Sequence, residues 1–274
     1  DLLPDSSPTG FISESRGGIQ VIGATFGQTG LGLSIIGGSV DFRSGGSALS
    51  GNGSDISIDA AELSLTGGGL IGTVSPEGKV GGMIQVRADA VTLQGGNIRT
   101  VSAGGAGGAI QLNGKSFNAS GGVVQSIAFG DEPAGPVSIT MEDSIRGDMN
   151  SFVDSASYGD GGLSPVFLKA ASVVLDGPDF ARASGVRMIA YQGPTSTISI
   201  EGDQIEAPMG LLINEARADA SLSIDDGYGS ISLSGNTLNL GLPFDGKVEK
   251  SVNPSLTFYT HSKNTGQTGN IRVV

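Results

Sequence analysis

The sequence predicts an all-β chain wound into a parallel β-solenoid with three short strands per coil. Pairs of Ile, Val or Leu separated by one residue recur along the chain, and a second such pair begins seven residues after the first. Alternation with a period of two is typical of a strand, and strands that recur after glycine turns are typical of a coil that stacks on itself. Glycine supplies 47 of the 274 residues, which suits the tight turns of a solenoid.

The pattern is clearest in the three units that open at Ile56, Ile84 and Ile110. These units share one frame without a gap, and in each the second pair is followed by two glycines and another apolar residue. The residues predicted to form the core are Ile56, Ile58, Leu63, Leu65, Ile84, Val86, Val91, Leu93, Ile98, Ile110 and Leu112.

The same opening recurs on both sides of these units, at Leu33, Val137, Val166, Ile198, Ile231 and Ile271. The interval lengthens from 23 residues between Leu33 and Ile56 to 40 residues between Ile231 and Ile271. Only the unit at Val137 slips, because its second pair starts one place late, at Ile145. We therefore expect about eight coils in one β-helix domain spanning residues 1–274. The chief loops are expected near residues 1–16, 131–136, 158–165 and 242–254.

Alternate residues of each strand are expected to point into a narrow apolar core of Ile, Val, Leu, Phe and Ala, and the residues between them to face water. One coil cannot bury its own apolar side, so stacked neighbours complete the core. The predicted outward set is polar and comprises Ser57, Ser64, Gln85, Thr92, Gln111, Asn118, Ser199 and Asn239.

Composition argues against several classes of partner and site. The net charge of −12 disfavours nucleic acid and anionic membrane surfaces, and no apolar run approaches the length of a membrane span. Cysteine is absent, so neither a disulfide framework nor a cysteine-based metal site is expected. We expect no cofactor.

Residues 81–98 follow the form Gly-Gly-x-Ile-x-Val-x-Ala-x-x-Val-x-Leu-x-Gly-Gly-x-Ile. This form resembles the filamentous-haemagglutinin type of repeat in secreted bacterial exoproteins. The resemblance implies a right-handed parallel β-helix that leaves a Gram-negative cell through a dedicated outer-membrane secretion pore, by the two-partner route. It further implies an adhesin, matrix fibre or stalk outside the cell or on its surface, where the partners are a host or neighbouring cell surface or matrix.

The resulting hypothesis is a structural or adhesive role without catalysis. Arg146-Gly147-Asp148 is an integrin-type tripeptide, and we expect it on an exposed loop because it lies just past the slipped pair. Some adhesins of the family that the chain resembles carry such a tripeptide.

The alternative is a polysaccharide-processing lyase or glycosidase-like enzyme, since right-handed β-helices also host such enzymes. It would need clustered carboxylates with a basic group. The candidates are Asp225-Asp226 and His261, both expected at surface turns. A calcium site is a further hypothesis, at Asp154, Asp160, Asp176 and Asp179, which fall near predicted corners.

The two ends carry a last expectation. Residues 271–274 would open a coil, and residues 1–30 would supply only part of one. Bare terminal coils offer unpaired backbone groups, so we expect adjoining coils or other copies to stack end to end on this chain.

Overall fold

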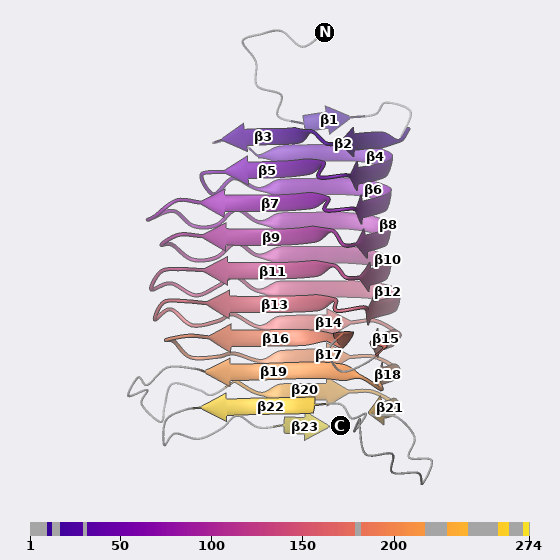
Figure 1. The fold of residues 1–274 in the computed structure, drawn as a ribbon, viewed down its shortest axis with the longest axis vertical. Helices are drawn as coiled ribbons and strands as arrows, with labels where there is room; N and C mark the ends of the chain where they lie inside the picture. Colours follow the sequence, from indigo (N-terminus) through magenta and orange to yellow (C-terminus); the bar gives the residue numbers. More distant parts are fainter. Residues whose placement is uncertain are drawn as a thin grey trace, which may run out of the picture.

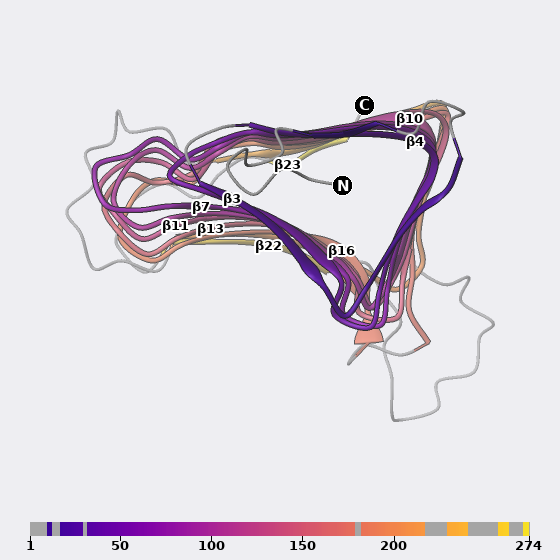
Figure 2. The same cartoon turned by 90° about the horizontal axis from the view of Figure 1, so that it is seen from above.

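The computed structural model describes residues 10–12, 17–29, 32–178, 182–216, 229–240, 257–262 and 271–273. These residues form a parallel β-solenoid of about seven turns, where the sequence predicted about eight. The turns stack along one axis (Figure 1), and each follows a similar three-sided path when viewed along that axis (Figure 2). No helix in the described part of the chain is long and apolar enough to cross a membrane.

Within the described residues the strands form two parallel sheets, which we call sheet A and sheet B. Sheet A has 14 strands: β1 (Gly10–Ile12), β2 (Ile19–Ile22), β4 (Leu33–Arg43), β6 (Ile56–Thr66), β8 (Ile84–Gln94), β10 (Ile110–Ser120), β12 (Val137–Asp148), β14 (Val166–Lys169), β15 (Ser172–Leu175), β17 (Ile198–Glu201), β18 (Gln204–Ala207), β20 (Ile231–Ser234), β21 (Thr237–Leu240) and β23 (Ile271–Val273). Sheet B has nine: β3 (Thr25–Thr29), β5 (Ser47–Gly51), β7 (Leu70–Ser75), β9 (Asn97–Ser102), β11 (Val123–Ala128), β13 (Phe152–Ser157), β16 (Ser184–Ala190), β19 (Gly210–Ala216) and β22 (Thr257–Ser262).

The predicted openings pair with one another in register along sheet A. Leu33 lies opposite Ile56, Ile56 opposite Ile84, and the series continues without interruption to Ile231 opposite Ile271. Parallel pairing of equivalent residues buries the same positions in every turn. The register predicted from the repeat is therefore confirmed.

The predicted slip of the unit at Val137 is also confirmed. Where β10 pairs with β12, the register shifts between Gly114 and Ser116, and Phe117 lies opposite Ile145. One extra residue in β12 is absorbed as an irregularity at the bend of the strand, so the apolar residues on either side stay on the core face.

The long strands of sheet A divide in two after β12. Residues 137–140 of β12 pair with β14, and residues 144–147 pair with β15. At the other end of the solenoid, β1 and β2 pair with the two parts of β4, and β3 pairs with β5. The three strands β1, β2 and β3 thus pair with both parts of β4 and with β5, before the repeat that the sequence shows from Leu33. We expected residues 1–30 to supply only part of a coil, and the strands within residues 10–29 contribute more than that.

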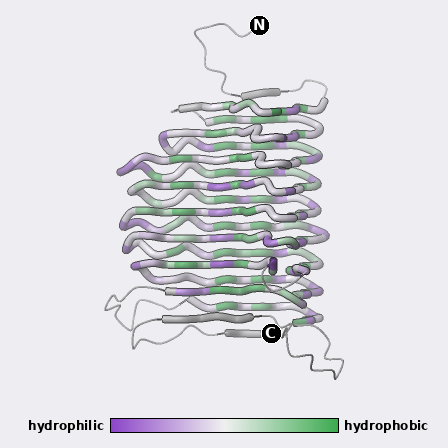
Figure 3. Tube along the Cα trace, in the orientation of Figure 1, coloured by the Kyte–Doolittle hydropathy of each residue, from purple (hydrophilic) through white to green (hydrophobic). Residues whose placement is uncertain are grey.

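All predicted core residues are buried, from Ile56 and Ile84 through Leu112, with at most 1% of each side chain exposed. The predicted outward residues are all exposed or half-buried. Hydrophobic positions recur at matching places from turn to turn (Figure 3). This burial of stacked apolar rows is the main favourable contribution to the stability of the solenoid.

The core is less uniformly apolar than the sequence predicted. Inward positions of sheet B carry buried hydroxyls, and Thr73, Thr100 and Ser126 pair in register on β7, β9 and β11. The hydroxyl of Thr73 donates to the carbonyl of Gly82 at 2.9 Å, and that of Thr100 to Gly108 at 2.9 Å. These bonds satisfy loop carbonyls that would otherwise be buried without a partner, which explains why Ser and Thr replace aliphatic residues here.

Candidate functional site

Two open depressions of about 520 and 700 Å³ lie at the bend of the sheet A strands. They share Met141 and Glu142, so together they form one groove that runs along the solenoid axis from Asp59 to Asn236. We call this the axial groove. Each of its two parts is larger than a separate hollow of about 190 Å³ on sheet B.

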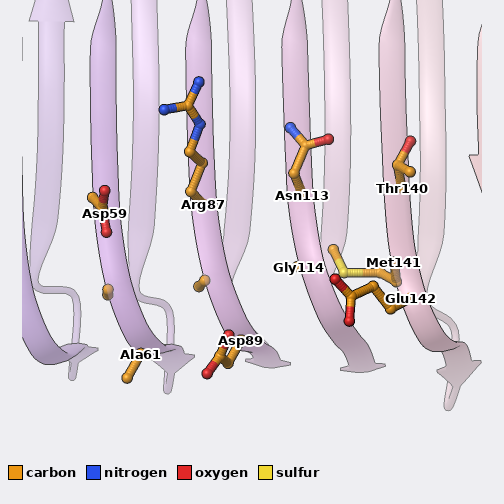
Figure 4. Close-up of a pocket in the computed structure, with 11 residues that line it drawn as sticks. Asp59, Ala61, Arg87, Asp89, Asn113, Gly114, Thr140, Met141 and Glu142 are labelled. Carbon is orange, nitrogen blue, oxygen red and sulfur yellow. The ribbon is translucent and has the colours of Figure 1, made fainter.

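Strand register aligns one wall of the axial groove. Residues at the same place on successive strands lie opposite one another, and the row reads Asp59, Arg87, Asn113, Thr140, Lys169, Glu201 and Ser234. Neighbours in such a row are about 4.8 Å apart. The first four members lie side by side on neighbouring strands (Figure 4). A polar group is thus presented once per turn.

The floor of the groove consists mainly of small residues at the bend. Ala88 and Gly114 lie opposite each other, and Met141 follows in the same row. A Cβ added to Gly114 would lie 1.7 Å from the carbonyl oxygen of Ala88, so only glycine fits this close backbone approach. The side chain of Met141 extends toward the space beside Gly114 (Figure 4).

Charges in the groove pair between adjacent turns. Lys169 Nζ lies 3.2 Å from Glu201 Oε2, and Lys115 Nζ lies 3.2 Å from Asp89 Oδ2 at the rim. All four side chains are more than 40% exposed, so each pair contributes at most about 1 kcal/mol. Glu142 lies beside Gly114, on the same side of the groove floor as Asp89 (Figure 4). The groove therefore presents acidic and basic side chains on successive turns along the axis.

The integrin-type tripeptide is on a strand and not on a loop, contrary to our expectation. Arg146, Gly147 and Asp148 are the last three residues of β12, in register with Asn118 through Ser120. Gly147 is buried, while the Arg146 side chain is 53% exposed and lies 3.9 Å from the carboxylate of Asp148. The extra residue of β12 is absorbed upstream, before Ser144, so the tripeptide stays in the ladder. Its adhesive role stays a prediction.

The acids of the predicted calcium site that the structure describes do not converge. Asp154 lies on β13 in sheet B, whereas Asp176 follows β15 in sheet A. Asp160 is in the loop after β13, and Asp179 and the pair Asp225-Asp226 lie outside the described residues. Across the described ranges, no three His, Asp or Glu side chains are placed to hold a metal ion.

His261 is in strand β22, opposite Glu215 of β19, so the predicted surface turn is wrong for its backbone. The two are cross-strand neighbours in sheet B. The strand extends one residue beyond His261, to Ser262, because residues 257–262 continue the ladder of β19.

Sequence reasoning missed a polar cluster on the outward face of sheet B. Asp154 and Arg187 lie opposite each other on β13 and β16. The guanidinium donates from Nε to Oδ1 at 2.8 Å and from Nη2 to Oδ2 at 2.6 Å, and its carbon lies 3.8 Å from the ring centroid of Phe152. Burial raises the pKa of Asp154, while the hydrogen bonds and charge of Arg187 act in the opposite direction.

Three aromatic rings stack beside this cluster at the ends of their strands. The centroids of Phe129 and Tyr158 are 4.9 Å apart and those of Tyr158 and Tyr191 are 4.4 Å apart, with 12° between ring planes in both pairs. Each ring directly follows its sheet B strand, one turn apart. Aligning the ends of the sheet B strands would have revealed this ladder, because Ala128, Ser157 and Ala190 precede the rings in register.

Comparison with protein-family models, with curated proteins and with solved structures finds no match to this chain. The repeat and its geometry are therefore the basis for any functional assignment.

Proposed function

We propose that this chain is a structural and adhesive segment outside the cell or on a bacterial surface, a rigid rod whose repeated outer face contacts a host or neighbouring cell or its matrix. The observation that carries the proposal is the unbroken register from Leu33 to Ile271, in which core residues repeat while outward residues differ from turn to turn. Such a solenoid provides length and a large surface with few internal constraints on outward side chains.

The finer architecture is part of this proposal. We infer three strands per coil, because the two parts of β12 pair with separate strands, and β13 in sheet B would complete the coil. We infer a right-handed coil, because crossovers between parallel strands of one sheet are almost always right-handed. Both features agree with the filamentous-haemagglutinin type of repeat that residues 81–98 resemble, and hence with export through an outer-membrane pore.

Adhesion of beads coated with the purified chain to cultured epithelial cells and to immobilised matrix proteins tests this function. We expect saturable attachment that soluble chain competes away. Attachment no greater than that of albumin-coated beads, on every surface tried, would contradict the proposal. The variant Asp148→Glu measures the share due to the tripeptide, because it keeps the charge while displacing the carboxylate.

The axial groove favours one second candidate, a polysaccharide-processing enzyme. Glu142 and Asp89 lie on the same side of the groove floor, one turn to either side of Lys115, and an extended polymer fits along the axis. Incubation with polygalacturonate and alginate, followed by assay of new chain ends, tests it. Turnover that Glu142→Gln abolishes would establish catalysis, whereas intact substrate after long incubation would exclude it for these polymers.

A further inference from the structure

A second, smaller hollow of about 190 Å³ lies on sheet B, away from the axial groove. Its lining combines three rows of the outward face: Gln125, Asp154 and Arg187 in one row, Ala156 and Ile189 in the next, and Tyr158 and Tyr191 at the strand ends. Ala156 is smaller than its row neighbours Ile127 and Ile189, and this missing volume makes the hollow. We call it the sheet B pocket.

The polar side of the sheet B pocket is fixed in place. Asp154 faces outward, yet only 7% of its side chain is exposed. Burial removes most of the hydration of its carboxylate, which is unfavourable for a charged group and is not required of an outward residue of this sheet. Its two-bond contact with Arg187 and the packing of Arg187 on Phe152 hold the carboxylate and guanidinium in one geometry. Preorganised polar groups of this kind bind hydroxyl-bearing ligands with little loss of side-chain entropy.

The opposite side of the pocket is aromatic. Tyr158 is 41% exposed even though its ring stacks on Phe129 and Tyr191, and it lines the pocket together with Tyr191. An aromatic wall facing fixed donors and acceptors matches a ligand that has both C–H and O–H faces.

We propose that the sheet B pocket binds one neutral pyranose unit of a glycan. The volume is below the roughly 300 Å³ at which sites for drug-sized ligands begin, which suits a single sugar ring. Asp154 and Arg187 neutralise each other, so the pocket offers hydrogen bonds without a net charge that would select an ionised ligand. This inference rests on the proposed adhesive function and names the class of its ligand.

The test titrates the whole chain with the methyl pyranosides of glucose, galactose, mannose and N-acetylglucosamine and with neutral tetrasaccharides. Methyl glucuronide is the charged comparator. Saturation-transfer NMR and tyrosine fluorescence report binding, and the absence of tryptophan simplifies the second signal. We expect at least one neutral sugar to bind in the millimolar range or tighter and methyl glucuronide to bind more weakly.

The variant Ala156→Gln fills the pocket without altering the ion pair, and we expect it to weaken binding at least tenfold. Val74→Gln is the matched control, because Val74 occupies the same row on β7 through Val101 and Ile127, and is 49% exposed. We also expect Tyr158→Ala, which removes the aromatic wall, to weaken sugar binding, and this result does not depend on Ala156→Gln. Circular dichroism confirms that each variant is folded.

No binding by any neutral sugar, preference for methyl glucuronide, or equal binding by wild type and Ala156→Gln would each overturn the proposal. The bead assay separates this outcome from failure of the adhesive function. Beads that still attach while no sugar binds would leave adhesion intact and reject the glycan, whereas sugar binding without attachment would reject adhesion alone.

Discussion

The glycine pair after strand β8, Gly95-Gly96, acts through two different constraints at adjacent residues. Gly95 has φ of 68°, which side-chain-bearing residues rarely adopt. At Gly96 a larger residue would clash, because an added Cβ would lie 2.4 Å from Leu65 Cβ on the preceding turn. The turn between sheets A and B therefore needs glycine for conformation at one position and for contact at the next.

We expect Gly96→Ala to lower the free energy of unfolding by about 1–3 kcal/mol, as overpacking of a close contact does. Urea denaturation followed by circular dichroism measures the change. Gly27→Ala is the control, because a Cβ there meets nothing within 4 Å. Equal stability of Gly96→Ala and wild type would show that the turns are not packed as described.

Met149 occupies the position equivalent to Gly121 on the next turn, yet its φ is 54°. A left-handed backbone costs a residue with a side chain about 1–2 kcal/mol. Gly121 has φ of 66°, and a Cβ there would make only an ordinary contact with the carbonyl oxygen of Met149, at 3.6 Å.

The pair allows a reciprocal prediction. Met149→Gly should stabilise the chain by about 1 kcal/mol, and Gly121→Ala should destabilise it by a similar amount. Thermal unfolding of the two variants beside wild type measures both shifts. Shifts of the same sign would contradict the assignment of strain to backbone conformation.

At the scale of the element, strand β12 shows how the solenoid accommodates an insertion. Three residues separate Thr140 from Ser144, whereas two separate the corresponding residues Asn113 and Ser116 of β10. The following turn also has two, between Lys169 of β14 and Ser172 of β15. The extra residue is thus confined to one bend, and the strands on both sides keep their faces.

Deleting Asp143 should therefore leave the chain folded with unchanged or higher stability, since it restores the spacing of both neighbouring turns. Deleting Ala90 from the regular strand β8 should prevent folding, because Val91 and Leu93 would move from the core face to the solvent face. Far-UV circular dichroism and size-exclusion chromatography distinguish the two products. A folded Ala90 deletion together with an unfolded Asp143 deletion would refute this account of β12.

The sequence was sufficient to predict the pairing of Ile84 with its neighbours, because the apolar period and the glycine turn act locally and repeat. It was insufficient for the sheet B pocket. Asp154 and Arg187 are 33 residues apart in a part of the chain where the interval drifts, and single charged residues have no period. The small residues of the axial groove floor likewise resemble any other Ala or Gly of the repeat until the strand bend is known.

At the scale of the molecule, the core, the axial groove and the sheet B pocket all arise from the stacking of equivalent residues along the solenoid axis. Stacking in register places Asp59 beside Arg87 by the same rule that places Ile58 beside Val86. Outward residues can change from turn to turn without disturbing the core, so one scaffold carries the polar row of the axial groove, the tripeptide on β12 and the stacked rings that follow the sheet B strands.

The central claim is parallel stacking in register, and disulfide trapping tests it most directly because the chain contains no cysteine. The outward residues Gln85 and Gln111 lie opposite each other on β8 and β10. Neighbouring parallel strands are about 4.8 Å apart, which is within the range that a disulfide spans. We expect the double variant Gln85→Cys, Gln111→Cys to form an intramolecular disulfide on mild oxidation, and Gln85→Cys, Asn118→Cys to remain reduced, since Asn118 lies opposite Thr92. A disulfide in the second variant but not in the first would contradict the solenoid described here.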